Sequence, residues 1–167
     1  MNIVLIQPSL NKDSKTSVVL NHAKQSYEER GDSVTLYDLR EVEIPQCRAV
    51  GLEDYNNSTL LEIQKKLIKA DAVVFWMPVY QYSFSWVLKN FIDLFWRDLL
   101  YKKACFVTVS WWVRSYMAVW DLIKVLYFEC GMQCVAPFVH AWAWDFEDWE
   151  VTNPKVFEKI ATMVENT

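Results

Sequence analysis

The segment 72–77, AVVFWM, constrains the fold more than any other part of the chain. Its six residues are all apolar, with no polar residue on alternate positions. A strand with one face in water alternates apolar and polar side chains, whereas a strand covered on both faces reads as an unbroken apolar run. The segment therefore predicts a central strand that is packed between two layers.

Short apolar runs and segments of helical periodicity alternate along the rest of the chain. The expected strands are 1–6, 33–37, 72–77, 104–109 and 132–139. The expected helices are 16–30, 58–70, 85–96, 115–130 and 154–164. Five strands alternating with five helices predict an α/β fold with a parallel sheet and helices on both faces, formed as a single domain over residues 1–167.

Composition narrows the classes of partner. The 167 residues are 53% hydrophobic and carry a net charge of −4, and the basic residues do not gather on one face or stripe. Nucleic acid is therefore not an expected partner. Apolar runs are too short for a membrane span, and the first residues lack a basic leader, so we expect a cytoplasmic protein. The four cysteines, in no CxxC pair, are expected to be reduced thiols.

Three loops should meet where ligands bind in such a sheet, outside the carboxyl ends of the strands. They are residues 7–15, 78–84 and 110–114. The first, QPSLNKDSKT, places hydroxyls and a lysine before a helix, whose N-terminus favours a phosphate. Its candidate ligands are Ser9, Asn11, Ser14, Lys15 and Thr16. In the simpler interpretation, Ser14 or Asp13 only caps the helix.

Three stretches together resemble the NAD(P)H-dependent FMN reductase family and its quinone reductase relatives. They are VLIQPSLNKDSKT, YDLREVEIP and ADAVVFWMPVYQYSFSWVLKNFID. The last is similar to a family pattern of the form ADxxxxxxPxYxxSxSxxLKNxID in order, spacing and context. The resemblance implies a flavodoxin-like fold with a five-stranded parallel sheet in the order 2-1-3-4-5.

The resemblance also implies an oxidoreductase that passes a hydride from NAD(P)H to N5 of a bound FMN, and then electrons to a flavin, quinone or other small acceptor. The FMN phosphate would lie in the first loop. The flavin ring would lie against the other two loops, at Pro78, Val79, Tyr80, Gln81, Tyr82, Ser83, Ser110, Trp111 and Trp112. Because the flavin supplies the chemistry, no catalytic side chain is expected. His22 and His140 are interpreted as structural.

The chain departs from the family pattern in all three loops. The family has GSxR where this chain has Pro8, Ser9, Leu10 and Asn11, so both the glycine and the phosphate-facing arginine are absent. None of the three glycines lies in a predicted ligand loop, and two indoles follow Ser110 in place of a glycine-rich turn. The tryptophans either wall a flat ligand or fill the flavin space. The second reading gives an alternative function, a binding module that has lost or altered FMN binding.

A third option, a flavodoxin-type electron carrier, is disfavoured because the first loop lacks the Thr/Ser-rich pattern of such carriers. The segment 140–150, HAWAWDFEDWE, mixes three tryptophans with acidic residues. Alternation at Trp142 and Trp144 predicts that the fifth strand continues to the binding edge, where the segment forms a lid or a subunit contact. Since the family is commonly dimeric or tetrameric, we expect a homodimer or homotetramer.

Overall fold

The computed structural model describes residues 1–12 and 14–167, apart from the side chain of Thr16. Its main sheet contains six parallel strands. They are β1 (Asn2–Gln7), β2 (Ser33–Asp38), β3 (Ala72–Pro78), β4 (Lys103–Ser110), β5 (Gln133–Cys134) and β6 (Val139–Trp142). The order β2-β1-β3-β4-β5 confirms the predicted flavodoxin-like topology.

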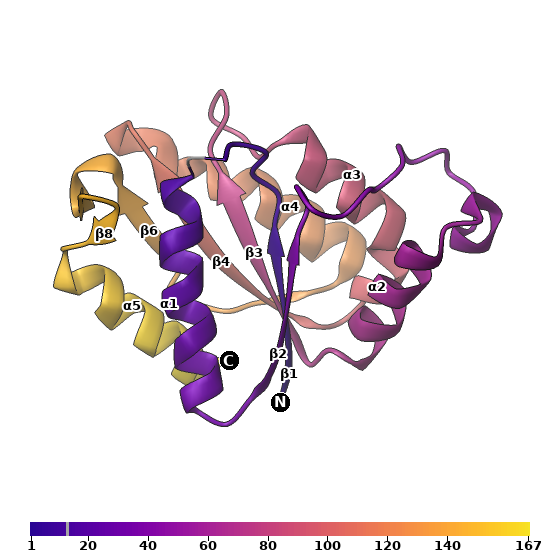
Figure 1. Ribbon diagram of the computed structural model, residues 1–167, viewed down its shortest axis with the longest axis horizontal. Coiled ribbons are helices and arrows are strands. Elements are labelled where there is room, and N and C mark those ends of the chain that lie inside the picture. Colours follow the sequence, from indigo (N-terminus) through magenta and orange to yellow (C-terminus); the bar gives the residue numbers. More distant parts are fainter. Residues whose placement is uncertain (13) are drawn as a thin grey trace.

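Helices cover both faces of this sheet, as the uniformly buried β3 requires. The α-helices are α1 (Lys15–Glu29), α2 (Ser58–Lys69), α3 (Trp86–Phe95), α4 (Val119–Cys130) and α5 (Pro154–Asn166). Figure 1 shows α1 and α5 together on one face and α2, α3 and α4 on the other. Two buried apolar clusters, one under each group of helices, make up the core.

Short elements complete the chain between these helices and strands. They are the 3-10 helices η1 (Leu52–Tyr55), η2 (Trp96–Leu99), η3 (Val113–Ala118) and η4 (Ala143–Asp145), and the antiparallel pair β7 (Phe146–Glu147) and β8 (Glu150–Val151). The predicted helix 115–130 therefore begins four residues late, because 3-10 geometry occupies its first turn. It ends at Gly131 as predicted, where φ is +60°.

The predicted fifth strand, 132–139, is wrong in its bounds. The chain forms two short strands instead, and β5 and β6 both pair with β4. Pro137 lies between them and has no N–H to donate to β4, so pairing is interrupted there. The predicted continuation through Trp144 is also wrong, since β6 ends at Trp142 and Trp144 belongs to η4.

The four cysteines are free, as predicted, with Cys105 and Cys130 buried and the other two half-buried. Burial raises the pKa of Cys130 to about 11, helped by the nearby Glu129 carboxylate. A thiol with a raised pKa is a poor nucleophile, and Cys130 packs in one of the two buried apolar clusters. Within the described residues, no helix combines the length and the apolar character needed to cross a bilayer.

Candidate functional site

A cavity of about 360 Å³ lies at the carboxyl edge of the sheet, and residues from all three predicted loops line it. This edge is the upper one in Figure 1, toward which the strand arrows point. The lining residues are Ser9, Asn11, Ser14, Lys15, Pro78, Val79, Tyr80, Val109, Ser110, Trp111, Ala143 and Trp149. The parallel topology brings these loops together because β1, β3 and β4 are neighbours in the sheet.

The side chain of Gln7 shapes the start of the first loop. Gln7 is buried, and its Oε1 accepts a hydrogen bond from the backbone N–H of Ser9 at 2.5 Å. Its Nε2 donates to the carbonyl of Ser9 at 3.2 Å and to Oδ1 of Asp38 at 3.3 Å. One amide thus holds both backbone groups of Ser9 and ties the loop to the end of β2.

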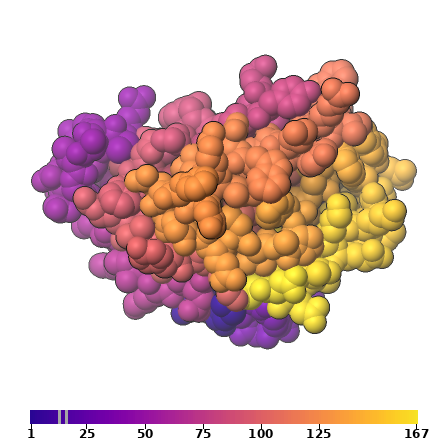
Figure 2. All heavy atoms as spheres, turned by 180° about the vertical axis from the view of Figure 1, so that it is seen from behind, coloured from indigo at the N-terminus to yellow at the C-terminus, as the bar shows by residue number. Residues whose placement is uncertain are grey.

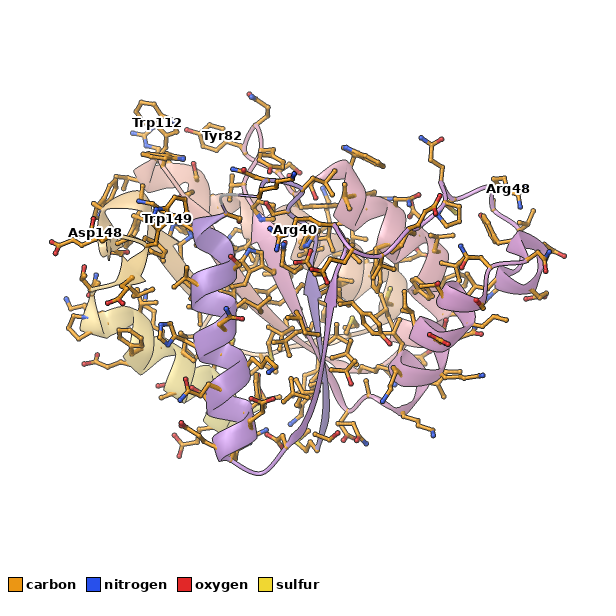
Figure 3. All side chains as sticks on the ribbon, in the orientation of Figure 1. Arg40, Arg48, Tyr82, Trp112, Asp148 and Trp149 are labelled. Carbon is orange, nitrogen blue, oxygen red and sulfur yellow. The ribbon has the colours of Figure 1, made fainter. Side chains whose placement is uncertain are left out.

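Arg40 supports the same loop from outside. Its Nε donates to Oδ1 of Asp38 at 2.9 Å, and its Nη1 donates to the carbonyls of Asn11 and Lys12 at 3.2 and 3.4 Å. Burial alone would raise the pKa of Asp38, but hydrogen bonds from Arg40 and Gln7 lower it below its usual value. Arg40, labelled in Figure 3, therefore positions the loop, a role that sequence reasoning missed.

The predicted phosphate ligands lie at the N-terminal end of α1. Ser9 is 1% exposed and Ser14, the N-cap residue, is buried, while Lys15 opens the helix and Asn11 is exposed. The hydroxyl of Ser9 forms no hydrogen bond with any residue that the structure describes. Asp13 and the side chain of Thr16 are outside the described residues.

The second loop contains a tight turn with a tyrosine at a position that favours glycine. Tyr80 and Ser83 exchange two backbone hydrogen bonds of 2.9 Å, so residues 80–83 form a tight two-residue turn. The central residues Gln81 and Tyr82 have φ of +50° and +62°. Such turns favour glycine, yet this chain places a tyrosine there, at the rim. Pro78, Val79 and Tyr80 line the cavity, whereas Gln81, Tyr82 and Ser83 lie outside its lining.

A second turn also has non-glycine residues at positive φ. Residues 147–150 connect β7 to β8, and their central residues Asp148 and Trp149 have φ of +43° and +68°. Non-glycine residues pay about 1–2 kcal/mol each for the left-handed region. Both turns therefore accept backbone strain and carry an aromatic side chain at their second central position, one of which, Trp149, lines the cavity.

The third loop does not fill the cavity. Ser110 is buried, but Trp111 and Trp112 are 74% and 73% exposed. Trp111 contributes to the lining and Trp112 does not. Figure 3 shows Trp112 extending outward at the edge of the molecule. The reading in which these indoles fill the flavin space is not favoured, because both side chains are mostly exposed.

A buried histidine ties the third loop to the sheet. His140 lies between Thr108 Oγ1, 2.5 Å from its Nδ1, and Ser110 Oγ, 3.2 Å from its Nε2. Ser110 Oγ in turn donates to the carbonyl of Trp112 at 3.2 Å. Burial, reinforced by Lys159, lowers the pKa of His140 to about 4, so the ring is neutral and can donate on one side while accepting on the other. This supports the structural role predicted for it.

Sequence reasoning missed three of the lining residues, Val109, Ala143 and Trp149. Val109 belongs to β4 and was assigned only to the sheet. Ala143 and Trp149 belong to the segment 140–150, whose density of tryptophan pointed to the binding edge without saying which side chain reaches it. The turn that aims Trp149 has no sequence signal, since Asp-Trp is not a usual turn pair.

Other hollows lie away from the three loops. The largest, about 1190 Å³, is a surface depression between α3, α4 and residues 47–53. A smaller one of about 290 Å³ lies between Thr108, Tyr116 and Lys159. Among the described residues, no group of three His, Cys, Asp or Glu side chains is arranged to hold a metal ion. The cavity at the carboxyl edge is therefore the one that the fold singles out for a ligand.

The topology defines a flavodoxin-like protein, with a cavity at the carboxyl edge of its sheet. Solved structures with this fold include FerB, a flavoenzyme NAD(P)H:(acceptor) oxidoreductase from Paracoccus denitrificans, with a TM-score of 0.80, 20% identity and coverage of 98% of this chain and 95% of that one. The apo form of the NADH:FMN oxidoreductase EMOB gives a TM-score of 0.78 at 20% identity, with 98% and 86% of the two chains covered.

An NAD(P)H:quinone oxidoreductase from Methanothermobacter marburgensis gives a TM-score of 0.71 at 13% identity, with 99% and 98% covered. No curated protein matches the chain. The model of the family described as NADPH-dependent FMN reductase, however, matches residues 1–145. The chain belongs to this family, and its general activity is that of an NAD(P)H-dependent flavin oxidoreductase. FMN is accordingly the cofactor and NAD(P)H the co-substrate.

The residues present fit FMN. The cavity combines polar lining residues from the first loop and the start of α1, Ser9, Ser14 and Lys15, with apolar lining residues from the other loops, Pro78, Val79 and Trp111. A phosphate suits the polar lining and a flat aromatic ring suits the apolar lining. The alternative reading, a binding module without flavin, is not favoured.

Proposed function

We propose that the protein uses FMN to pass electrons from NAD(P)H to a small-molecule acceptor, such as a free flavin or a quinone. The observation that carries this proposal is the single cavity in which the loops after β1, β3 and β4 meet. Its lining combines polar and apolar residues, as a flavin mononucleotide requires.

In this proposal the first loop binds the FMN phosphate, and the other two hold its ring. Phosphate contacts are assigned to Ser9, Asn11, Ser14, Lys15 and Thr16. Ring contacts are assigned to Pro78, Val79, Tyr80, Gln81, Tyr82, Ser83, Ser110, Trp111 and Trp112. Within the second set, Pro78, Val79, Tyr80, Ser110 and Trp111 line the cavity, so direct contact falls to them and the rest shape its rim.

When bound, FMN accepts a hydride from NAD(P)H and returns electrons to the acceptor. The protein's own tasks are binding, orientation and the exclusion of water. Gln7 and Arg40 hold the first loop in place, and His140 fixes the start of the third. The neutral His140 lies in the sheet behind Ser110 and serves as a support.

The exposed rings at the mouth give the co-substrates a place to bind. Tyr80, Tyr82, Trp111 and Trp112 are each about half exposed or more, and they come from the two loops assigned to the flavin ring. Nicotinamide, quinone and isoalloxazine groups are all flat and aromatic, and offset stacking suits such rings. A surface of this kind supports a site that admits several acceptors of the same shape.

We also propose that the protein forms a homodimer or homotetramer. Large apolar side chains are exposed along η3 and α4, a face seen in Figure 2. They are Val113, Tyr116, Met117, Trp120, Tyr127 and Phe128. Large exposed apolar patches commonly mark contacts between proteins. Light scattering coupled to gel filtration tests this, and a monomer at micromolar concentration would contradict it.

The function is tested by adding FMN to the purified protein, removing the excess and recording the visible spectrum. Retained flavin bands that bleach with NADPH or NADH under anaerobic conditions, and return on addition of a quinone or free flavin, are expected. A protein that retains no flavin would overturn the proposal. Retained flavin that neither nicotinamide reduces would instead indicate an electron carrier.

A further inference from the structure

Lys15 lines the cavity from an unusual position among aromatic rings. It is the first residue of α1, and its ammonium nitrogen lies 6.0 Å from the ring centroid of Trp111, 5.4 Å from that of Phe146 and 5.9 Å from that of Trp149. The aromatic cage, as we call these three rings, comes from the loop after β4 and from the β7–β8 hairpin. Residues more than 90 positions apart in the chain therefore surround one cation.

Cation–π attraction gives this arrangement its physical effect. An ammonium within about 6 Å of an aromatic face is attracted by the ring quadrupole, by roughly 0.5–1 kcal/mol per exposed contact. A lysine side chain otherwise samples many rotamers. The cage restricts Lys15 to the cavity that it lines, together with Trp111 and Trp149. Figure 3 shows Trp149 beside the N-terminal end of α1.

A second, independent feature points to an anion in the same cavity. Ser9 is 1% exposed and lines the cavity, and its hydroxyl has no hydrogen-bond partner among the residues that the structure describes. The N-terminus of α1 adds backbone N–H donors and a partial positive charge. A buried hydroxyl, a restrained ammonium and a helix N-terminus together form a site suited to a phosphate monoester.

We propose that Lys15, held by the aromatic cage, is the cation that selects FMN over riboflavin, in place of the arginine that the first loop lacks. This inference rests on the proposed function, and it assigns the selection to residues that sequence reasoning had not connected. Trp149 is the positioning residue. It touches Lys15 from a turn whose φ of +68° disfavours any residue with a side chain, so the chain accepts backbone strain to keep the ring there.

The test compares the dissociation constants of FMN and riboflavin by fluorescence quenching. The wild-type protein is expected to bind FMN at least tenfold more tightly. Lys15→Gln should reduce this ratio about tenfold by weakening FMN alone, because a charged hydrogen bond to phosphate is lost. Lys15→Arg should restore most of it. Lys12→Gln is the matched control, since Lys12 is exposed in the same loop but does not line the cavity.

The cage is tested separately through Trp149. Trp149→Gly should lower the FMN-to-riboflavin ratio about two- to fivefold while raising stability, because it removes the ring and relieves the strain together. Trp149→Phe keeps a ring and should keep most of the ratio. Tyr101→Gly relieves the same kind of strain, at a φ of +61° outside the cavity lining, and should leave the ratio unchanged.

Each outcome points to a different conclusion. If the wild-type protein binds both flavins equally, or if Lys15→Gln leaves the ratio unchanged, then Lys15 does not select the phosphate and the inference fails while the proposed function stands. If only Trp149→Gly has no effect, the cage does not position Lys15, and that part of the inference is overturned. If neither flavin binds the wild-type protein, the proposed function itself fails.

Discussion

At the β1 end of the cavity, polar side chains hold the loop to the fold, whereas at the β4 end exposed aromatic rings form the wall. Gln7, Asp38 and Arg40 connect the first loop to β2 through hydrogen bonds and one ion pair. The third loop is held mainly by His140 and Ser110, and its indoles are in water. The polar end, at β1, is thus held by a network of hydrogen bonds, whereas the aromatic end, at β4, is formed mainly by exposed rings.

The largest expected effect concerns the support under the aromatic end. His140 has a folded-state pKa of about 4, below the 6.5 of an unperturbed histidine. As pH falls, the unfolded chain therefore takes up the proton first. The neutral, buried His140 therefore contributes to the free energy of unfolding fully above about pH 6.5. This contribution falls by on the order of 3 kcal/mol as the pH is lowered from there to pH 4. Urea unfolding of wild type and His140→Gln across this range measures it, and equal pH dependence in the two would contradict it.

Removing the support under the polar end should have the next largest effect. Arg40→Met removes the guanidinium that donates to the Asp38 carboxylate and to two loop carbonyls, and we expect a loss of about 1–2 kcal/mol in the free energy of unfolding. Lys89→Met is the control. It breaks an exposed pair with Asp93 and should change stability by less than about 0.5 kcal/mol. Equal effects of the two changes would show that Arg40 stabilises the fold no more than an ordinary exposed ion pair does.

Relief of strain at the aromatic rim should give a smaller change of opposite sign. Tyr82→Gly removes a side chain from a residue with φ of +62° and should stabilise the protein by roughly 0.5–1 kcal/mol. Asn56→Gly is the matched control, because asparagine tolerates its φ of +50° far better and little gain is expected. Thermal unfolding measures both. Destabilisation by Tyr82→Gly would mean that the ring has packing partners beyond this chain.

The smallest effect is expected at Trp112, which is 73% exposed. Trp112→Ser should change the free energy of unfolding by less than about 0.5 kcal/mol in dilute protein. The measurement should be repeated at higher protein concentration. A loss of unfolding free energy that grows with concentration would place Trp112 at a contact between copies. A large loss in dilute protein would mean that the aromatic end is packed more firmly than its exposure indicates.

The sequence predicts the layers and strand order well because these depend on local periodicity and on covered apolar runs. The segment 72–77 becomes β3 with every side chain buried, and Gly131 ends α4 as expected. The fifth strand was misjudged because apolar residues on both sides of Pro137 conceal the break in pairing. Periodicity reports which side chains are apolar, and it does not report where a proline removes a donor.

The site was predictable in position but not in detail. The rule for parallel sheets located the three loops, and the resemblance named the cofactor. Whether the side chains of Trp111 and Trp112 point into the cavity or into solvent was not predictable, since the sequence of the loop is compatible with either. The contacts of Lys15 with Phe146 and Trp149 were beyond reach too, because they depend on a strained turn and on a separation of more than 130 residues.

The β7–β8 hairpin, which contributes two rings of the aromatic cage, lies outside the region that matches the family model. The family match ends at residue 145, one position before Phe146, so two of the three rings around Lys15 lie outside the shared region. A chimera that exchanged residues 146–167 with those of a relative would keep every motif by which the family is recognised. If the aromatic cage has the role proposed for it, such a chimera would hold Lys15 differently. Part of the proposed phosphate selection thus lies outside the stretch by which the family is recognised.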